Sequence, residues 1–356
     1  MSSGSDAERK AVATRPSSPE DVLPAVQPPS AGFLLQLFLI PMMIVSVIVA
    51  VWFMFSWLAS AGSDPRELVR DLKKLNNSSW QKAVSLANQL QDPKYDALRD
   101  DADLAGELAS VLRTELDSGM ADEARVSLRV YLCRILGEFR VDAGLPTLLD
   151  AAKQEKSIEE VRVRVAALEA LAVLANNIGP EKAREASGLL ETVLDSSKAV
   201  APAQDTEGLF AELRSRSAFV LGVLGGEAAT ERLVQMLDDS YPNARYNAAT
   251  GLARQGDTRC CPVLLVMLDP SNQEAIEGET IESNREAKRL SVVVNGLRAA
   301  GQLLNKLDAN SETDDSRAVR AAIEKLSTQG EPKAIGLVAR DVLRGLARSP
   351  WRPKSP

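Results

Sequence analysis

Two stretches of the chain decide its fold: LRSRSAFVLGVLGGEAATERLVQMLDDS at residues 213–240 and ARYNAATGLARQGDTRCCPVLLVMLDPS at residues 244–271. They align without gaps at an offset of 31 residues. The nine identical pairs are Arg214/Arg245, Ala218/Ala249, Leu221/Leu252, Gly225/Gly256, Leu233/Leu264, Met236/Met267, Leu237/Leu268, Asp238/Asp269 and Ser240/Ser271. A repeat of this length predicts a stack of helical hairpins, because one hairpin cannot bury its apolar face alone.

Each shared position has a mechanical role in such a hairpin. Ala218 and Ala249 are small, so paired helices can approach closely. Gly225 and Gly256 stand where the first helix is expected to end, a place that favours left-handed backbone. The expected apolar face of the second helix consists of Leu233, Met236, Leu237, Leu264, Met267 and Leu268.

Looser copies of the pattern occur at residues 127–152, 162–177 and 188–197. Together these segments resemble the HEAT-repeat family, whose units read approximately V-R-x-x-A-A-x-A-L-x-x-L-G-D before a leucine-rich second helix. The segment Arg245–Asp257 matches best, although Gln255 replaces the usual leucine. The resemblance implies a right-handed stack of antiparallel helix pairs that presents extended surfaces to other proteins.

The predicted fold class is therefore all-α: an α-solenoid of HEAT-like helical hairpins preceded by a single transmembrane helix. Outside the repeats the helical spacing of apolar residues persists, and terminal repeats are expected to be atypical. The predicted parts are a disordered N-terminal tail (1–31), a transmembrane helix (32–61), a divergent helical N-terminal part of the solenoid (62–119), HEAT-like repeats (120–271), divergent C-terminal helical repeats with acidic loops at Asn272–Glu286 and Asp308–Asp315 (272–348), and a disordered C-terminal tail (349–356).

No charged residue occurs between Val22 and Ser63, and the apolar run from Phe33 to Leu58 is longer than the ~20 residues that cross a bilayer. A buried core helix would be shorter and interrupted by polar residues. A cleaved signal peptide is the other alternative, with Ala59–Ala61 resembling its cleavage site. The run is too long for a signal peptide and no basic cluster precedes it, which favours a retained span.

The charges beside the span predict its orientation. Only Arg15 precedes it closely, whereas five cations follow it: Arg66, Arg70, Lys73, Lys74 and Lys82. The positive-inside rule then places the large C-terminal part in the cytoplasm. The three cysteines, Cys133, Cys260 and Cys261, form no CxxC pair and are expected to be buried apolar side chains, which agrees with a reducing compartment.

Composition excludes several classes of function. The formal net charge of −7 argues against nucleic-acid binding, because such proteins carry excess positive charge. The chain contains no histidine, which removes most zinc sites and every His-dependent general base. No phosphate-binding or nucleophile-elbow motif occurs. We expect no enzyme, no cofactor, no metal and no small-molecule substrate.

Arginines recur near the starts of the predicted first helices: Arg125, Arg162, Arg164, Arg214, Arg216 and Arg245. They either line a surface that grips acidic partners or form an intramolecular ladder with turn aspartates such as Asp150 and Asp238. The repeat-to-repeat register favours the ladder.

Near the C-terminus, Arg340, Arg344 and Arg348 recur every four residues and form a candidate interaction surface. Anionic lipid headgroups would attract these cations. Alternatively, they cover the solvated face of a capping helix and complement its dipole, which is the favoured interpretation.

The predicted function is that of a single-pass membrane protein whose HEAT-like solenoid binds or scaffolds partner proteins at the membrane. Residues 32–61 provide the membrane contact. The alternatives are a structural spacer of the cell envelope and a HEAT-like lyase enzyme.

Overall fold

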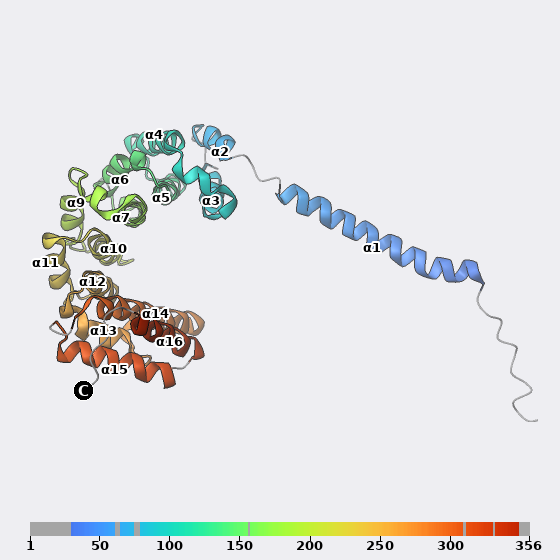
Figure 1. Cartoon of the computed structure of the whole chain (residues 1–356). Coiled ribbons are helices and arrows are strands. Elements are labelled where there is room, and N and C mark those ends of the chain that lie inside the picture. The colour runs from blue at the N-terminus through green and yellow to red at the C-terminus, as the bar shows by residue number, and fades with distance from the viewer. Residues whose placement is uncertain are drawn as a thin grey trace, which may run out of the picture. The chain divides into compact units, whose positions relative to one another are not determined.

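Helices make up all the regular structure that the computed structural model describes, which confirms the all-α prediction (Figure 1). The described residues are 30–60, 65–74, 79–155, 157–308, 311–329 and 332–348. The predicted tails lie outside them, apart from Ser30 and Ala31. The chain divides into two compact units, Met1–Ser63 and Asp64–Pro356.

The first unit contains helix α1 (Ala31–Ser60), which matches the predicted span to within one residue at each end. Its segment Leu35–Phe55 has a mean hydropathy of 2.7, and none of it is buried. At ~1.5 Å rise per residue, such a helix is long enough to cross the ~30 Å apolar layer of a bilayer. Pro41 lies inside this helix.

The second unit is a curved double row of helices (Figure 1). The inner row is α3 (Ser79–Gln91), α5 (Glu123–Gly137), α7 (Glu160–Ile178), α10 (Leu209–Leu224), α12 (Pro242–Gln255) and α14 (Glu282–Lys306). The outer row is α4 (Ala102–Ser118), α6 (Leu145–Ala152), α9 (Leu189–Ser196), α11 (Glu227–Met236), α13 (Cys261–Met267) and α15 (Asp314–Gln329). Each inner helix packs against the next, so the inner row is continuous.

Further elements complete this unit. They are α2 (Pro65–Leu72), α8 (Pro180–Arg184), α16 (Lys333–Arg348) and the 3-10 helices η2 (Pro93–Asp100), η3 (Asp142–Gly144), η4 (Thr258–Cys260) and η5 (Glu274–Ile276). Buried apolar side chains form one core cluster from Leu68 to Leu346.

The two aligned repeats fold as α10–α11 and as α12–η4–α13. Gly225 (φ 64°) and Gly256 (φ 85°) end the first helices with positive φ, as predicted. Ala218 and Ala249 are fully buried. Of the residues expected on the second helices, all are buried except Leu237, which is half-buried.

The acidic connectors are shorter than predicted. Helix α14 already begins at Glu282, inside the expected loop Asn272–Glu286, and α15 begins at Asp314. Asn272 is buried, and its Nδ2 donates a hydrogen bond to the hydroxyl of Tyr246 at 2.8 Å. This end of the first connector is therefore fixed to α12 and is not a free loop.

Helices α10 and α12 make their closest approach at Gly222 and Gly251, a pair that the repeat alignment does not match. A Cβ atom at Gly222 would lie 2.6 Å from the Cα of Gly251, and one at Gly251 would lie 2.7 Å from the Cα of Gly222. Glycine within a helix is unfavourable by about 1 kcal/mol, so close packing is the reason for both.

The substitution Gly222→Ala should lower the free energy of unfolding by about 2 kcal/mol, because the added methyl group forces α10 and α12 apart. Thermal unfolding of the full chain in detergent, followed by circular dichroism, measures the change. Gly106→Ala in α4 is the matched control: its Cβ meets nothing within 4 Å, so stability should rise. Equal stability of the two variants would contradict the close crossing.

Candidate interaction surface

The arginines near the starts of first helices form the predicted intramolecular ladder. Each pairs with a carboxylate: Arg125 with Glu115 (2.7 Å), Arg162 with Glu123 (2.8 Å), Arg164 with Glu155 (3.4 Å), Arg214 with Asp239 (2.8 Å), Arg216 with Glu212 (2.8 Å) and Arg245 with Glu274 (2.6 Å). All six therefore have an intramolecular partner: Arg162 joins α7 to α5, whereas Arg214 pairs within its own repeat and Arg216 within its own helix.

The two aspartates expected in the ladder are not its members. Asp239, one residue after the predicted Asp238, accepts two hydrogen bonds from Arg214 and one from the backbone N–H of Tyr241. Asp150 pairs with Arg113 on α4 instead, at 3.7 Å. The prediction of these partners was wrong because the turn aims Asp239, not Asp238, at the first helix.

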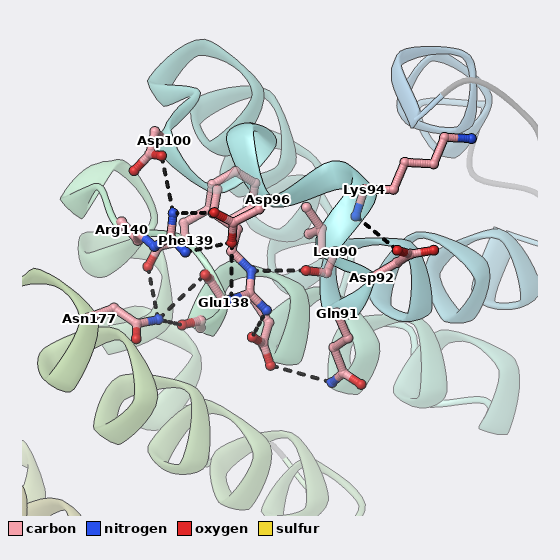
Figure 2. A network of polar contacts seen from close by, with 12 residues as sticks. Leu90, Gln91, Asp92, Lys94, Asp96, Asp100, Glu138, Phe139, Arg140 and Asn177 are labelled. Carbon is pink, nitrogen blue, oxygen red and sulfur yellow. Dashed lines mark hydrogen bonds and ion pairs between the residues drawn. The ribbon is translucent and has the colours of Figure 1, made fainter.

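A polar network joins η2 to the ends of α5 and α7 (Figure 2). Arg140 binds Asp96 at 2.6 Å, and this hydrogen bond lowers the pKa of the Asp96 carboxyl. Arg99 pairs with Glu138 at 3.1 Å. From α7, the side-chain amide of Asn177 donates to the carbonyl oxygen of Glu138 and to the carbonyl oxygens on either side of it. We call these five residues the clamp; its groups bind one another and leave no open site.

A second network is buried between α4, α5 and α7. Arg129 is fully buried and pairs with Glu160 at 2.7 Å. Burial raises the pKa of Glu115, the partner of Arg125. Burial also raises the pKa of the neighbouring Cys133 thiol to about 12. This thiol is therefore not a nucleophile at neutral pH.

All three cysteines are buried and free, as the sequence predicted. Within the described ranges, no group of three or more His, Cys, Asp or Glu residues is placed to hold a metal ion.

The C-terminal arginines have partners within their own unit. Arg340 donates to the carbonyl oxygen of Ser327 at 2.8 Å, and Arg344 pairs with Asp341 at 2.9 Å. Both side chains are exposed on α16. The side chain of Arg348 lies outside the described residues. Lipid contact by this surface stays a prediction.

A groove crosses the inner row of helices. One part, of about 390 Å³, is lined by Glu212, Ser215, Arg216, Phe219, Asn243, Tyr246, Asn247, Thr250, Arg254, Met267, Val292, Asn295, Arg298, Ala299 and Gln302. A second part, of about 350 Å³, is lined by Ser127, Val130, Tyr131, Arg134, Arg162, Val165, Ala166, Glu169, Leu209, Glu212 and Arg216. The two parts share Glu212 and Arg216 in their lining, and we call them together the inner groove, whose lining extends from α5 to α14.

The inner groove is cationic although the chain is acidic. Five arginines and two glutamates line it, whereas the whole chain has a formal net charge of −7. The two glutamates lie close to one arginine: Arg216 is 2.8 Å from Glu212 and 3.9 Å from Glu169. Arg162 pairs with Glu123, which is not part of the lining, so the charges of the other three arginines are not neutralised by a carboxylate.

Three of the groove arginines lack a carboxylate partner. Arg134 lies over the ring of Tyr131, with 5.5 Å between its guanidinium carbon and the ring centroid. Arg254 donates one long hydrogen bond, of 3.4 Å, to the carbonyl oxygen of Gly222, and burial lowers the pKa of its guanidinium. Arg298 is exposed and makes no hydrogen bond or ion pair with any residue in the described part of the chain.

The repeat pattern in the sequence does not point to these three arginines, because Arg134, Arg254 and Arg298 lie beyond the starts of the first helices, where the arginines of the ladder recur. The sequence nevertheless contains an indication that these arginines are unpaired. None of the three has an acidic residue three or four positions before it, so no helical ion pair could form in that direction. Their alignment along one groove depends on the packing of separate helices.

Replacing Arg254 by Met should raise the free energy of unfolding by about 1 kcal/mol, because a half-buried charge without a counter-ion gives way to an apolar side chain of similar length. Arg214→Met is the matched control in α10. It should lower stability by about 2 kcal/mol, since Asp239 would lose its partner in a largely buried pair. Thermal unfolding of the full chain in detergent compares the two, and a loss of stability in both would contradict the assignment of Arg254.

The sequence matches no family model. No curated protein matches it. Among solved structures, the chain is similar to human deoxyhypusine hydroxylase in complex with glycerol, with 14% sequence identity over 78% of this chain and 88% of that chain. The TM-score of this pair is 0.31, a likeness that carries no inference about fold or activity.

Proposed function

We propose that this chain is a single-pass membrane protein whose helical unit is a HEAT-like solenoid that binds or scaffolds partner proteins at the membrane. The observation that carries the proposal is the inner groove, whose lining holds three arginines without carboxylate partners. Charges left unpaired in this way are typical of surfaces that a partner completes.

The solenoid part of the proposal rests on the repeat. Two gap-free copies at an offset of 31 residues fold as successive helical pairs, with matching glycines at the ends of α10 and α12. The apolar core runs through all the pairs without a break. Both features are expected of stacked repeats, in which each unit contacts its neighbours.

The membrane part rests on α1. Its segment Leu35–Phe55 is uncharged, and none of it is buried, so it is not a core helix of the described structure. A signal sequence has the same position and composition. The length of the apolar run favours a retained span, and the cations from Arg66 to Lys82 favour a cytoplasmic helical unit.

Binding is proposed in preference to catalysis because of the chemistry that the groove offers. Its polar side chains are mainly arginine and amide groups, which donate hydrogen bonds and stay in one protonation state near neutral pH. The chain has no histidine to act as general base.

Membrane anchoring is tested by placing charge in α1. The double substitution Val47→Arg and Val49→Arg should move the chain from the membrane pellet to the soluble or aggregated fraction, because each arginine at the centre of a span costs about 3 kcal/mol. Val200→Arg is the control: this valine is 84% exposed in the second unit, so the chain should stay in the membrane. Fractionation after carbonate washing, with immunoblotting, measures the result.

The same preparation decides between a span and a signal peptide. Mass spectrometry of the intact protein should find α1 still attached. A mature chain that begins at Gly62 would remove the anchor and contradict the proposal. Protease treatment of intact cells should leave the second unit uncut if it is cytoplasmic.

A further inference from the structure

Arginines without a carboxylate partner occur in several places on the second unit, and three of them lie together on one face. Among the arginines that the structure describes there, those without a carboxylate partner include Arg134, Arg254 and Arg298, all on the lining of the inner groove. Arg254 shows that the arrangement is unfavourable for the isolated fold, because burial lowers its pKa and no acidic group opposes that effect. A ligand that brings carboxylates would remove this penalty.

We infer that the inner groove binds an extended, acidic segment of a partner protein, with carboxylates opposite Arg298, Arg254 and Arg134 and an apolar side chain between them. This inference rests on the proposed function and deepens it by stating the chemistry of the partner.

The spacing of the groove predicts the spacing of the partner's residues. Neighbouring helices pack about 8–10 Å apart, and an extended chain advances about 3.3 Å per residue, so one helix corresponds to about three residues. Arg298 lies on α14 and Arg254 on α12, the next inner helix. Their carboxylates should therefore stand about three residues apart in the partner.

The middle of the groove differs from its ends in that it carries no excess positive charge. Phe219 of α10 is half-buried in its lining, and Val165 of α7 is next along the row. Here Glu212 and Glu169 lie beside Arg216 and leave no excess positive charge. An apolar side chain of the partner suits this position, about three residues after its second carboxylate. The last carboxylate, opposite Arg134 on α5, then follows the second carboxylate by about nine residues.

This alternation favours a peptide over a continuous polyanion. A nucleic-acid strand carries a phosphate at every nucleotide, so some phosphates would face the two glutamates in the middle of the groove. A peptide can carry charge at its ends and none in between. The groove therefore favours a particular order of acidic and apolar side chains in its partner, as well as net negative charge.

The test uses the full chain in detergent micelles and a fluorescein-labelled peptide of about 13 residues, built on this spacing. It carries Glu at the first, fourth and last positions, Phe at the seventh, and Ser or Gly elsewhere. Fluorescence anisotropy should show saturable binding. The double variant Arg254→Gln and Arg298→Gln should weaken binding by about tenfold or more, because two charge-assisted contacts are lost.

A matched control separates the groove from charge in general. Arg70 and Arg340 also lack carboxylate partners, and each donates only to a backbone carbonyl oxygen, but neither lines the groove. The double variant Arg70→Gln and Arg340→Gln should keep the affinity within about twofold. An equal loss in both double variants would overturn the inference, as would the absence of peptide binding by the wild-type chain. Circular dichroism confirms that each variant is folded.

Changes in the peptide test its pattern. Replacing the first two Glu residues by Gln, or Phe by Ser, should weaken binding, whereas replacing a spacer Ser by Gly should not. A single-stranded oligonucleotide or phosphatidylserine vesicles that bind the same groove as tightly as the peptide would contradict a peptide site, because charge alone would then be sufficient.

A pull-down distinguishes failure of the inference from failure of the proposed function. If the wild-type chain and the Arg254→Gln, Arg298→Gln variant capture the same proteins from solubilised membranes, the groove inference is wrong and scaffolding stands. If the wild-type chain captures no protein, scaffolding is wrong, and the peptide experiment alone decides the groove. Loss of a captured protein in this variant, with retention in the Arg70→Gln, Arg340→Gln control, supports both.

Discussion

Burial of each helix against the next is the interaction on which the second unit depends. A single hairpin of about 30 residues has too little interior to be stable alone, so its apolar face must be covered by the neighbouring pair. The core accordingly continues from Leu68 to Leu346 without a break. The glycine contact between α10 and α12 shows how closely neighbouring helices pack, since the two helix backbones meet there without side chains between them.

Close packing of the inner row also creates the surface that we propose for binding. Because the inner helices lie side by side, side chains from five of them line the inner groove. Elsewhere many charged side chains pair with one another, as in the ladder and in the clamp of Figure 2. In the groove, Arg134, Arg254 and Arg298 have no carboxylate partner. Unpaired charge of this kind is expected on a surface that selection has retained for binding another molecule.

The sequence predicted features that depend on local spacing. The helix-ending role of Gly225 and Gly256, the buried faces of α11 and α13 and the extent of α1 all follow from periodicity within a short segment. The contact between Gly222 and Gly251 could not be predicted, because these residues are 29 positions apart and fall out of register with the 31-residue offset. The choice of Asp239 over Asp238 depends on how a turn points its side chains. The groove required knowledge of which faces of separate helices meet, and no single segment contains that information.

The clamp between η2, α5 and α7 has a mechanical consequence for the chain in its proposed, membrane-anchored form. Tension that enters the second unit through its N-terminal end acts first on α2 and α3, the helices at the open end of the row. Under tension, these helices would separate from the rest of the stack one at a time if only apolar contacts held them. Arg140 and Arg99 tie η2, which follows α3, to the end of α5, and Asn177 ties that end to α7, so several polar contacts share the load. The end of a stack is normally its weakest place, and the clamp makes this end resist the stepwise separation of its helices.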